Sequence, residues 1–389
     1  MAIQILTAVR THKTWVEIDT RALLNNYDAL CAVLGKERVA PVLKANAYGH
    51  GDEIVCQALP AVARLCVQDV WEAERLLSYG YRGIVLVMGG QLPSLLQGGF
   101  QDKGNLPANI ELTAGDFQFL QAWCQAKYKP KLHLKFDTGM GRQGFSPDDA
   151  PRVAAAVAPF KSHIVGVSSH FADAGDTFSP KYPTYQMERF AAVCRVMRDA
   201  GLVFQQHHAA SAAALLLPSS RHDFCRIGIS LYGFWTTATA KTMYAKQNKT
   251  VPTLKPILSW RAVLIAVRQL PAGSYIGYGC NYCTTRATKI AILPVGYFDG
   301  YPRQASGSYA YVLVRGKRCP ILGVVCMNML VIDVAHLEGV QVGDIATLIG
   351  TDGEECLAAE QLAAWANTIS YDITTRLHPS MPRQIVKHL

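Results

Sequence analysis

The pattern of hydrophobic and polar positions divides the chain into two parts of different character. From about residue 39 to 230, short apolar runs alternate with stretches in which apolar residues recur at helical spacing. The runs that predict strands are Val39–Leu43, Arg64–Val67, Ile84–Met88, Ile110–Thr113, Leu132–Phe136, Ile164–Ser168, Phe204–His208 and Phe224–Ile227. The clearest predicted helices are Asp52–Ala63, Trp71–Tyr79, Asp116–Ala126 and Tyr185–Ala200. Eight strands alternating with helices predict a parallel (β/α)8 barrel, and an open doubly wound sheet is the alternative because periodicity does not reveal closure.

The pattern changes after about residue 250. Strand-like segments separated by Gly, Pro and charged turns follow one another, namely Ile257–Leu270, Lys289–Val295, Tyr309–Val314, Leu330–Val334 and Ile345–Ile349. One late helix is predicted near Leu357–Ala366, and the polar stretch Thr236–Thr250 is predicted to be a linker. The sequence therefore predicts an α/β protein with a barrel over residues 20–245 and a mostly β C-terminal domain over residues 246–389.

Composition narrows the class of protein. Of the 389 residues, 50% are hydrophobic and 17% are charged, which is enough for a sizeable core. No apolar run reaches the roughly 18 residues of a membrane-spanning helix, and the first residues lack the design of a secretion signal. The eleven cysteines are scattered and odd in number, as in proteins with reduced thiols, so we expect a cytoplasmic protein that does not associate with a membrane. Cys280 and Cys283 have C-x-x-C spacing, but no second pair or suitably spaced histidine follows, so no metal site is predicted.

A net charge of +9 raises the alternative of a nucleic-acid-binding protein. The basic residues are spread along the chain, however, and the aromatic residues that would stack on bases are not interleaved with them. We therefore expect no nucleic-acid partner, and a basic surface also suits an anionic substrate or cofactor.

Side chains able to do chemistry follow the ends of several predicted barrel strands. In a parallel barrel these ends meet at one rim, where active sites are built. Lys44 directly follows the first strand, where burial would lower the pKa of its amine, as a nucleophile requires. Three glycines after Asp137 allow a tight loop that presents Arg142, a residue suited to a carboxylate. The remaining rim candidates are His170, Ser211 at a helix start that suits a phosphate, Arg226 and the following Gly228.

The β domain adds one further candidate. Tyr278 lies in a turn that is punctuated by Gly277 and Gly279 and flanked by Tyr275 and Tyr282. Tyrosines also pack half-buried for purely structural reasons, so the turn is a functional candidate only in combination with the residues at the barrel rim.

At this point the residues match a known family. The segment Val42–Gly51, which reads VLKANAYGHG, closely resembles the pyridoxal-phosphate attachment signature of alanine racemases. The resemblance extends from about Trp15 to Arg383. It includes, in the same order, Asp137 to Gly144, Ser169–Phe171, Arg226 to Gly233, the Tyr278 turn, Pro294–Tyr301, Cys326–Met327 and Thr368–Tyr371.

The resemblance implies an N-terminal barrel and a C-terminal β domain that the N-terminal strand, residues 13–19, joins. It also implies a head-to-tail homodimer with shared active sites and pyridoxal 5'-phosphate as cofactor. Lys44 would hold the cofactor covalently, His170 would lie against its ring, and Arg226 would face the pyridine nitrogen. The implied phosphate-binding groups are Tyr48, Ser211, the Gly228–Ile229 backbone and Tyr371.

The resemblance also implies the reaction, which interconverts L-alanine and D-alanine. Removing the α-proton from one face and returning one to the other needs two bases, and Lys44 and Tyr278 of the partner subunit would fill those roles. A phenol is ordinarily protonated near neutral pH, so it needs a nearby cation such as Arg142 to act as a base. Arg142 would also bind the substrate carboxylate, with Met327 of the partner subunit nearby. Lys135 matches a position that is carbamylated in some relatives.

Three positions depart from the commoner family pattern. Asn328 stands where Asp often follows Cys-Met, Ala210 replaces the Asn often found before the phosphate-binding serine, and Phe298 occupies a usually small position. Because Asn328 lies beside the implied substrate pocket, a broader racemase acting on serine or basic amino acids is the main alternative. A barrel-type pyridoxal-phosphate decarboxylase and a non-catalytic carrier of the cofactor are weaker alternatives. The first lacks its cysteine-containing signature here, and the second would lack the β domain and an equivalent of Tyr278.

Overall fold

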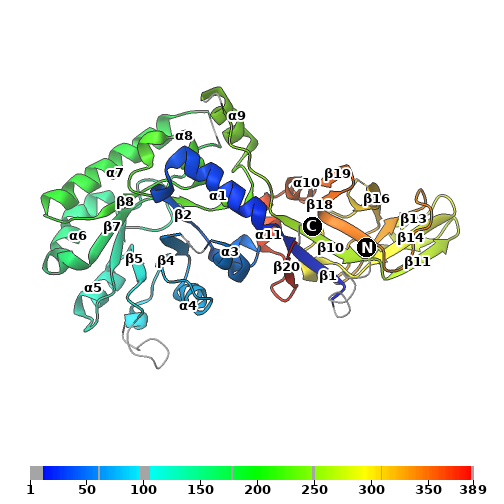
Figure 1. The fold of residues 1–389 in the computed structure, drawn as a ribbon, viewed down its shortest axis with the longest axis horizontal. Coiled ribbons are helices and arrows are strands. Elements are labelled where there is room, and N and C mark those ends of the chain that lie inside the picture. Colours follow the sequence, from blue (N-terminus) through cyan, green and yellow to red (C-terminus); the bar gives the residue numbers. More distant parts are fainter. Residues whose placement is uncertain are drawn as a thin grey trace. The chain divides into compact units, whose positions relative to one another are not determined.

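The structure is a computed structural model that describes residues 12–59, 62–96, 106–176, 178–247, 250–307 and 309–386 (Figure 1). Two compact units are present. The barrel unit comprises Arg21–Ala47 and Val55–Pro256. The β unit comprises the described residues up to Thr20, Tyr48–Ile54 and the chain from Ile257 onward.

Eight parallel strands form the centre of the barrel unit. They are β2 (Val39–Pro41), β3 (Arg64–Val67), β4 (Ile84–Gly90), β5 (Ile110–Ala114), β6 (Leu132–Lys135), β7 (Ile164–Ser168), β8 (Gln205–His207) and β9 (Cys225–Ile227). Strands β3 to β8 form one sheet in chain order, and β2 pairs with β9. The bridges Val42–Cys66 and Ala210–Arg226 join the two sheets at both edges, so the ring closes. The predicted barrel is therefore confirmed, and the open-sheet alternative was wrong.

Helices cover the outside of the strands (Figure 1). They are α1 (Thr20–Leu34), α3 (Asp52–Ala58), α4 (Val70–Ser78), α5 (Phe117–Gln125), α6 (Ala150–Val157), α7 (Lys181–Asp199) and α8 (Ser211–Leu216). Alternation along each strand separates the two faces of the barrel wall. In β6, Leu132 and Leu134 are fully buried on the face opposite that of His133 and Lys135. The apolar core therefore lies between strands and helices, and polar side chains point into the barrel interior.

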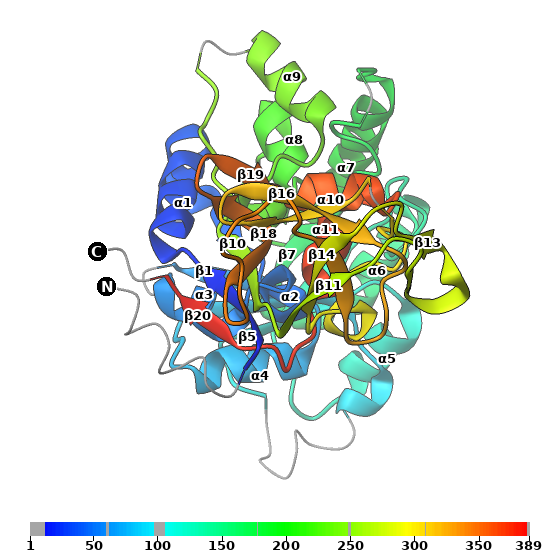
Figure 2. The same ribbon diagram turned by 90° about the vertical axis from the view of Figure 1, so that its right-hand side faces the viewer.

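The β unit is built on a ten-stranded sheet of order β11-β14-β17-β16-β15-β18-β10-β1-β20, with β19 paired to β18. Figure 2 shows several of these strands with helices α10 and α11. All pairings in this sheet are antiparallel except that of β1 with β20. The elements are β1 (Thr14–Ile18), β10 (Leu258–Val263), β11 (Ala266–Leu270), β14 (Thr288–Leu293), β15 (Tyr311–Val314), β16 (Lys317–Leu322), β17 (Leu330–Asp333), β18 (Ile345–Asp352), β19 (Glu355–Leu357), β20 (Arg383–Ile385), α10 (Ala359–Trp365) and α11 (Ser370–Thr375). A two-stranded hairpin, β12 (Tyr275–Ile276) and β13 (Tyr282–Cys283), carries the Tyr278 turn.

Some sequence-based expectations were wrong in detail. The stretch predicted to be a linker contains helix α9 (Ala238–Gln247), which buries Ala240 and Tyr244, four residues apart, in an otherwise polar sequence. The single strand predicted over Ile257–Leu270 is divided into β10 and β11, which pair with different neighbours. The β unit has a second late helix, α11, which at six residues is too short to show clear periodicity.

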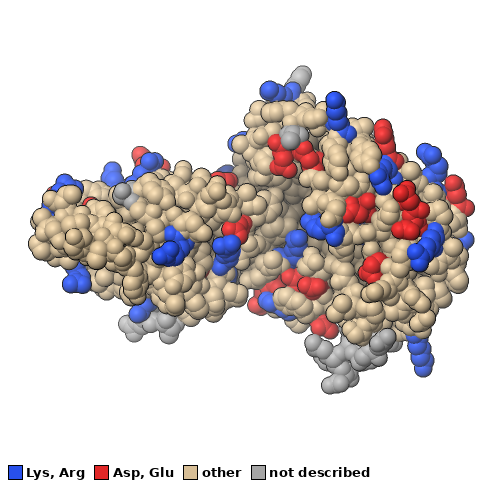
Figure 3. Space-filling view, turned by 180° about the vertical axis from the view of Figure 1, so that it is seen from behind, with Lys and Arg blue, Asp and Glu red and all other residues tan. Residues whose placement is uncertain are grey.

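The surface carries charges of both signs. On the face drawn in Figure 3, Lys and Arg side chains are interspersed with Asp and Glu over the barrel unit. On this face of the barrel unit, the basic side chains therefore do not form one continuous basic patch. Within the described ranges, no helix combines the length and apolar character needed to cross a membrane.

Candidate active site

Lys44 stands at the start of an unusual turn that follows β2. The turn, α2 (Lys44–Tyr48), has left-handed backbone angles at four consecutive residues that are not glycine, with φ between 52° and 54° from Ala45 to Tyr48. Such a conformation costs roughly 1–2 kcal/mol per residue, so the surrounding structure must hold it. Strain of this kind marks the turn as a candidate functional element.

Glu72 is one of the groups that hold this turn. Its side chain is buried, and one carboxylate oxygen accepts a hydrogen bond of 2.7 Å from the backbone N–H of Ala45. The other oxygen accepts from the backbone N–H groups of Gln68 (2.7 Å) and Asp69 (3.2 Å) at the start of α4. One carboxylate therefore caps a helix and anchors the turn that presents Lys44.

The Lys44 amine lies in a cationic, partly desolvated environment. Burial, and then the charge of Arg142, lower the pKa of Lys44, while Glu72 opposes the shift. A lowered pKa increases the share of the neutral amine, which is the form that acts as a nucleophile or base.

The glycine-rich loop after β6 is organised by Asp137. Its carboxylate accepts hydrogen bonds from four successive backbone N–H groups, those of Gly139 (2.9 Å), Met140 (2.6 Å), Gly141 (3.1 Å) and Arg142 (2.7 Å). Although burial opposes it, these bonds lower the pKa of Asp137. The loop is thereby folded around an ionised carboxylate, and it presents an exposed Arg142.

Lys135, at the end of β6, belongs to the same electrostatic cluster. Burial, followed by the charges of Arg226, Arg142 and Lys44, lowers the pKa of Lys135 to about 7. Its Nζ donates to Oε1 of Gln143 at 3.0 Å. The Nε2 atom of Gln143 is buried without a hydrogen-bond partner among the described residues.

Arg226, on β9, is 7% exposed and is held on several sides. Its Nη1 contacts Nδ1 (2.6 Å) and the carbonyl oxygen (2.9 Å) of His207. Its Nη2 donates to the carbonyl oxygens of Ser169 (2.8 Å) and His208 (3.0 Å) and contacts Nδ1 of His170 at 3.2 Å. Burial lowers the pKa of Arg226 to about 10, so the guanidinium is still charged at neutral pH. Burial and this positive charge hold the pKa of His170 well below its usual range, so His170 is neutral.

The remaining rim candidates of the barrel unit lie beside Arg226. Ser211 is the first residue of α8, and its Oγ accepts a hydrogen bond of 3.1 Å from the backbone N–H of Gly228. Ile229 follows at the start of a 3-10 turn that runs to Tyr232. The barrel unit thus brings together Lys44, Lys135, Arg142, His170, Ser211, Arg226, Gly228 and Ile229.

Four predicted site residues belong to the β unit. Tyr48 and Tyr371 lie next to each other, with ring centroids 6.1 Å apart. Tyr278 and Met327 are exposed, by 75% and 54% respectively.

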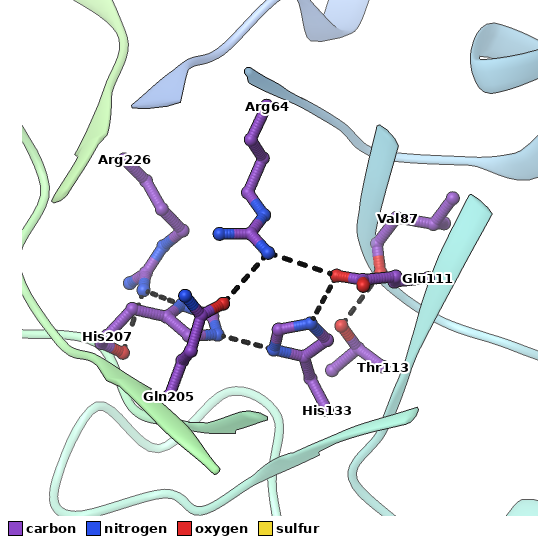
Figure 4. A network of polar contacts seen from close by, with 8 residues as sticks. All are labelled: Arg64, Val87, Glu111, Thr113, His133, Gln205, His207 and Arg226. Atoms are coloured by element: carbon purple, nitrogen blue, oxygen red, sulfur yellow. Dashed lines mark hydrogen bonds and ion pairs between the residues drawn. The ribbon is translucent and has the colours of Figure 1, made fainter. Parts of the chain in front are cut away.

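Sequence reasoning missed several polar residues that the structure places around the site. Glu72 was signalled by the D-x-x-E spacing from Asp69, which is a helix-capping pattern. Glu111 and His133 interrupt apolar strands and point into the barrel interior, where they connect through His207 to Arg226 (Figure 4). Among the described residues, no group of three or more His, Cys, Asp or Glu side chains is arranged to hold a metal ion.

Comparison with known proteins places the chain in one family. Residues 18–235 match the family model for the alanine racemase N-terminal domain, and residues 257–385 match that for its C-terminal domain. The alanine racemase of Leptospira interrogans serogroup Icterohaemorrhagiae serovar copenhageni is 36% identical over 387 residues, which cover 97% of this chain and 96% of the relative. The crystal structure of alanine racemase from Streptomyces lavendulae superposes with a TM-score of 0.83 at 29% identity, covering 97% of this chain and 98% of that one. The crystal structure of the enzyme from E. faecalis gives a TM-score of 0.82 at 31% identity, covering 96% and 98%. The chain therefore belongs to the alanine racemase family.

Proposed function

We propose that this protein is a pyridoxal-phosphate-dependent racemase that interconverts L-alanine and D-alanine. The observation that carries the proposal is the cluster of four basic side chains, Lys44, Lys135, Arg142 and Arg226, at one rim of a barrel of this family. Glu72 interacts electrostatically with Lys44, and Asp137 with Lys135. Both carboxylates already accept hydrogen bonds from backbone N–H groups. The cluster is therefore suited to anionic ligands that carry a phosphate or a carboxylate.

The residues present fit pyridoxal phosphate. Its aldehyde needs an amine of lowered pKa, which Lys44 supplies. Its phosphate needs hydroxyl and N–H donors, which Ser211 and the neighbouring Gly228–Ile229 backbone would supply within the barrel unit, while the phenols of Tyr48 and Tyr371 would contribute from the β unit. Arg226 would face the pyridine nitrogen, and His170 would lie against the ring.

When bound, pyridoxal phosphate supplies an electron sink that makes the α-proton of the amino acid acidic. The chain then has to move a proton at each face of the α-carbon. The Lys44 amine would do so at one face, where its lowered pKa keeps it available as a base. Tyr278 of the partner subunit would serve the opposite face, and Arg142 would orient the substrate carboxylate.

Arg226 would control how strongly the bound cofactor ring withdraws electrons. A guanidinium has only N–H donors, so Arg226, which is charged at neutral pH, would disfavour a proton on the nitrogen that it faces. This restrains electron withdrawal into the ring and would suppress side reactions such as transamination. Arg226 is thus the residue that we expect to keep the chemistry confined to proton exchange.

We further propose that the protein works as a homodimer in the cytoplasm. Tyr278 and Met327 are large and exposed, as expected of side chains that contribute to a neighbouring subunit's site. All eleven cysteines carry free thiols, which fits a reducing compartment. Asn328, where relatives of this family often have Asp, favours one second candidate, a racemase that also accepts serine or basic amino acids.

The deciding experiment incubates the purified protein with pyridoxal phosphate and L-alanine in heavy water, and then separates the enantiomers with mass detection. Deuterated D-alanine is the expected product. Deuterium exchange without inversion would contradict the role of Tyr278, and no exchange at all with cofactor bound would contradict alanine as substrate. Parallel assays with serine, lysine and arginine test the broader specificity.

A further inference from the structure

The interior of the barrel contains a chain of polar side chains that the proposed reaction does not use directly. Parallel barrels usually fill this space with bulky branched apolar residues. Here Arg226, His207, His133 and Glu111 are linked in series from β9, β8, β6 and β5 (Figure 4). The series runs from the rim, where Arg226 lies, to Glu111 near the beginning of β5.

Each link joins two polar atoms within hydrogen-bonding distance. Arg226 Nη1 lies 2.6 Å from His207 Nδ1, His207 Nε2 lies 2.9 Å from His133 Nδ1, and His133 Nε2 lies 2.9 Å from Glu111 Oε2. A guanidinium can only donate, so His207 Nδ1 accepts and the His207 proton sits on Nε2. His207 then donates to His133 Nδ1, and the His133 proton also sits on Nε2, from which it is donated to the carboxylate. Both ends of the chain thus require the same tautomers, because an ionised carboxylate only accepts.

The surroundings favour this single arrangement. His133 and His207 are buried, and burial lowers the pKa of each imidazole, so both rings are neutral. Although burial opposes it, the hydrogen bond from His133 lowers the pKa of Glu111, so the carboxylate is ionised. The ring of His207 stacks on Phe224 with centroids 4.4 Å apart, which restrains its rotation.

The backbone of β7 makes room for the chain. A Cβ atom built at Gly166 would overlap Nδ1 of His133, so the ring occupies the space that a side chain would take. The outer end is closed by Arg64, whose Nη2 lies 3.4 Å from Glu111 Oε2 and donates to Gln205 at 2.8 Å. With its side chain only 12% exposed, Arg64 separates the carboxylate from solvent and gives it a second cationic partner.

We propose that Glu111 and His133 are positioning residues that fix the tautomer of His207 and thereby the orientation of Arg226. If the His207 proton moved to Nδ1, two N–H groups would face each other and the guanidinium would turn away. With the chain intact, Nη1 and Nη2 are both engaged within the protein, and Nε makes none of these bonds. Nε is therefore the N–H group of Arg226 that this series of hydrogen bonds leaves available to a ligand. The inference rests on the proposed function, under which the atom that accepts from Nε is the pyridine nitrogen.

The test compares three substitutions in the full-length protein. Glu111→Leu removes the acceptor at the end of the chain. Glu111→Gln keeps an oxygen that can accept from His133 and removes the charge. Thr113→Val is the matched control, because Thr113 lies on the same strand and donates a buried hydrogen bond of 2.7 Å to the Val87 carbonyl, outside the chain (Figure 4). Thermal unfolding checks that each variant is folded.

The first measurement is 15N NMR of histidine-labelled apoprotein, which distinguishes protonated from unprotonated ring nitrogens. We expect protons on Nε2 of His133 and His207 in the wild type, in Glu111→Gln and in Thr113→Val, and mixed tautomers in Glu111→Leu. Unchanged tautomers in a folded Glu111→Leu protein would overturn the proposal.

The second measurement is made on the protein loaded with pyridoxal phosphate. We expect Glu111→Leu to lower kcat by about 10- to 100-fold, as loss of an orienting partner does elsewhere, with little change in KM for alanine and an altered absorbance spectrum of the bound cofactor. Glu111→Gln should restore most of kcat, and Thr113→Val should leave it unchanged. Equal losses in Glu111→Leu and Thr113→Val, or altered tautomers with a normal spectrum, would overturn the positioning role. A wild type that does not racemise alanine would instead contradict the proposed function, and the NMR result would still stand on its own.

Discussion

Lys135 and Gln143 form a hydrogen-bonded pair in which one donor group of Gln143 has no acceptor among the described residues. Gln143 accepts from the Lys135 amine through Oε1, while its buried Nε2 has no partner among the described residues. A buried donor without an acceptor costs about 1–3 kcal/mol. A carboxylate added to the Lys135 nitrogen would offer that acceptor and would place a negative charge near three basic side chains, Lys44, Arg142 and Arg226. The pair is therefore prepared for a carbamate, which forms when a neutral amine adds carbon dioxide and releases one proton.

We predict that Lys135 is carbamylated and that the extent depends on pH. Because the pKa of Lys135 is lowered to about 7, its amine is mostly neutral and reactive above that pH and mostly charged and unreactive below it. At a fixed concentration of dissolved carbon dioxide, the carbamate should therefore increase as pH rises through about 7. The measurement is 13C NMR after incubation with labelled bicarbonate, with Lys135→Met as control. A carbamate signal that persists in the control would assign it to another amine.

At the scale of elements, the turn that carries Lys44 depends on a carboxylate from a different strand–helix unit. Glu72 contacts Ala45, Gln68 and Asp69 through backbone N–H groups, so the end of β2 and the start of α4 share one anchor. The turn contains four consecutive residues in the left-handed region, and isolated chains do not hold such a conformation. Its geometry is therefore a property of this packing.

We predict that Glu72→Gln loosens the turn. Only one of the two side-chain oxygens remains, so at least one buried N–H loses its acceptor, and the free energy of unfolding should fall by about 1–3 kcal/mol. The affinity for pyridoxal phosphate should also fall, because Lys44 is less well presented. Urea unfolding of apoprotein and cofactor titration measure the two effects, and Glu74→Gln on the same helix is the matched control. A loss of stability with unchanged cofactor affinity would show that the turn is held without Glu72.

The same elements show what could be predicted from the sequence. Most of the eight barrel strands were found because they are short apolar runs, although β8 (Gln205–His207) is polar. The residues at the strand ends were found because chemistry in a barrel gathers at one rim. The interior chain was missed because Glu111 and His133 look like single polar interruptions of apolar strands, and only the register of β5, β6 and β8 brings them to His207. Helix α9 was missed because only two of its residues are buried. The pairing of strands that are distant in the sequence leaves no local signal by which the interior chain could have been found.

At the scale of the whole molecule, the predicted site residues are divided between the two units of the chain. Lys44 and Arg142 belong to the barrel unit, whereas Tyr278 and Met327 are exposed on the β unit. In a symmetric dimer, the β unit of each subunit would complete the barrel site of the other. Tyr278 and Met327 of each subunit would then contribute to the active site of its partner. In such an assembly, each active site takes its two bases from different subunits.

We therefore predict that two inactive variants restore activity when combined. Lys44→Ala and Tyr278→Phe should each abolish racemisation as homodimers, because every site then lacks one base. A hybrid dimer, isolated with two affinity tags, contains one site that lacks both bases and one site that has both, so its specific activity should be about half that of wild type if sites are shared symmetrically. If both bases of a site came from one subunit, each site of the hybrid would lack one base, and the hybrid would be as inactive as its parents. The comparison therefore decides between a shared and a self-contained active site without a structure of the dimer.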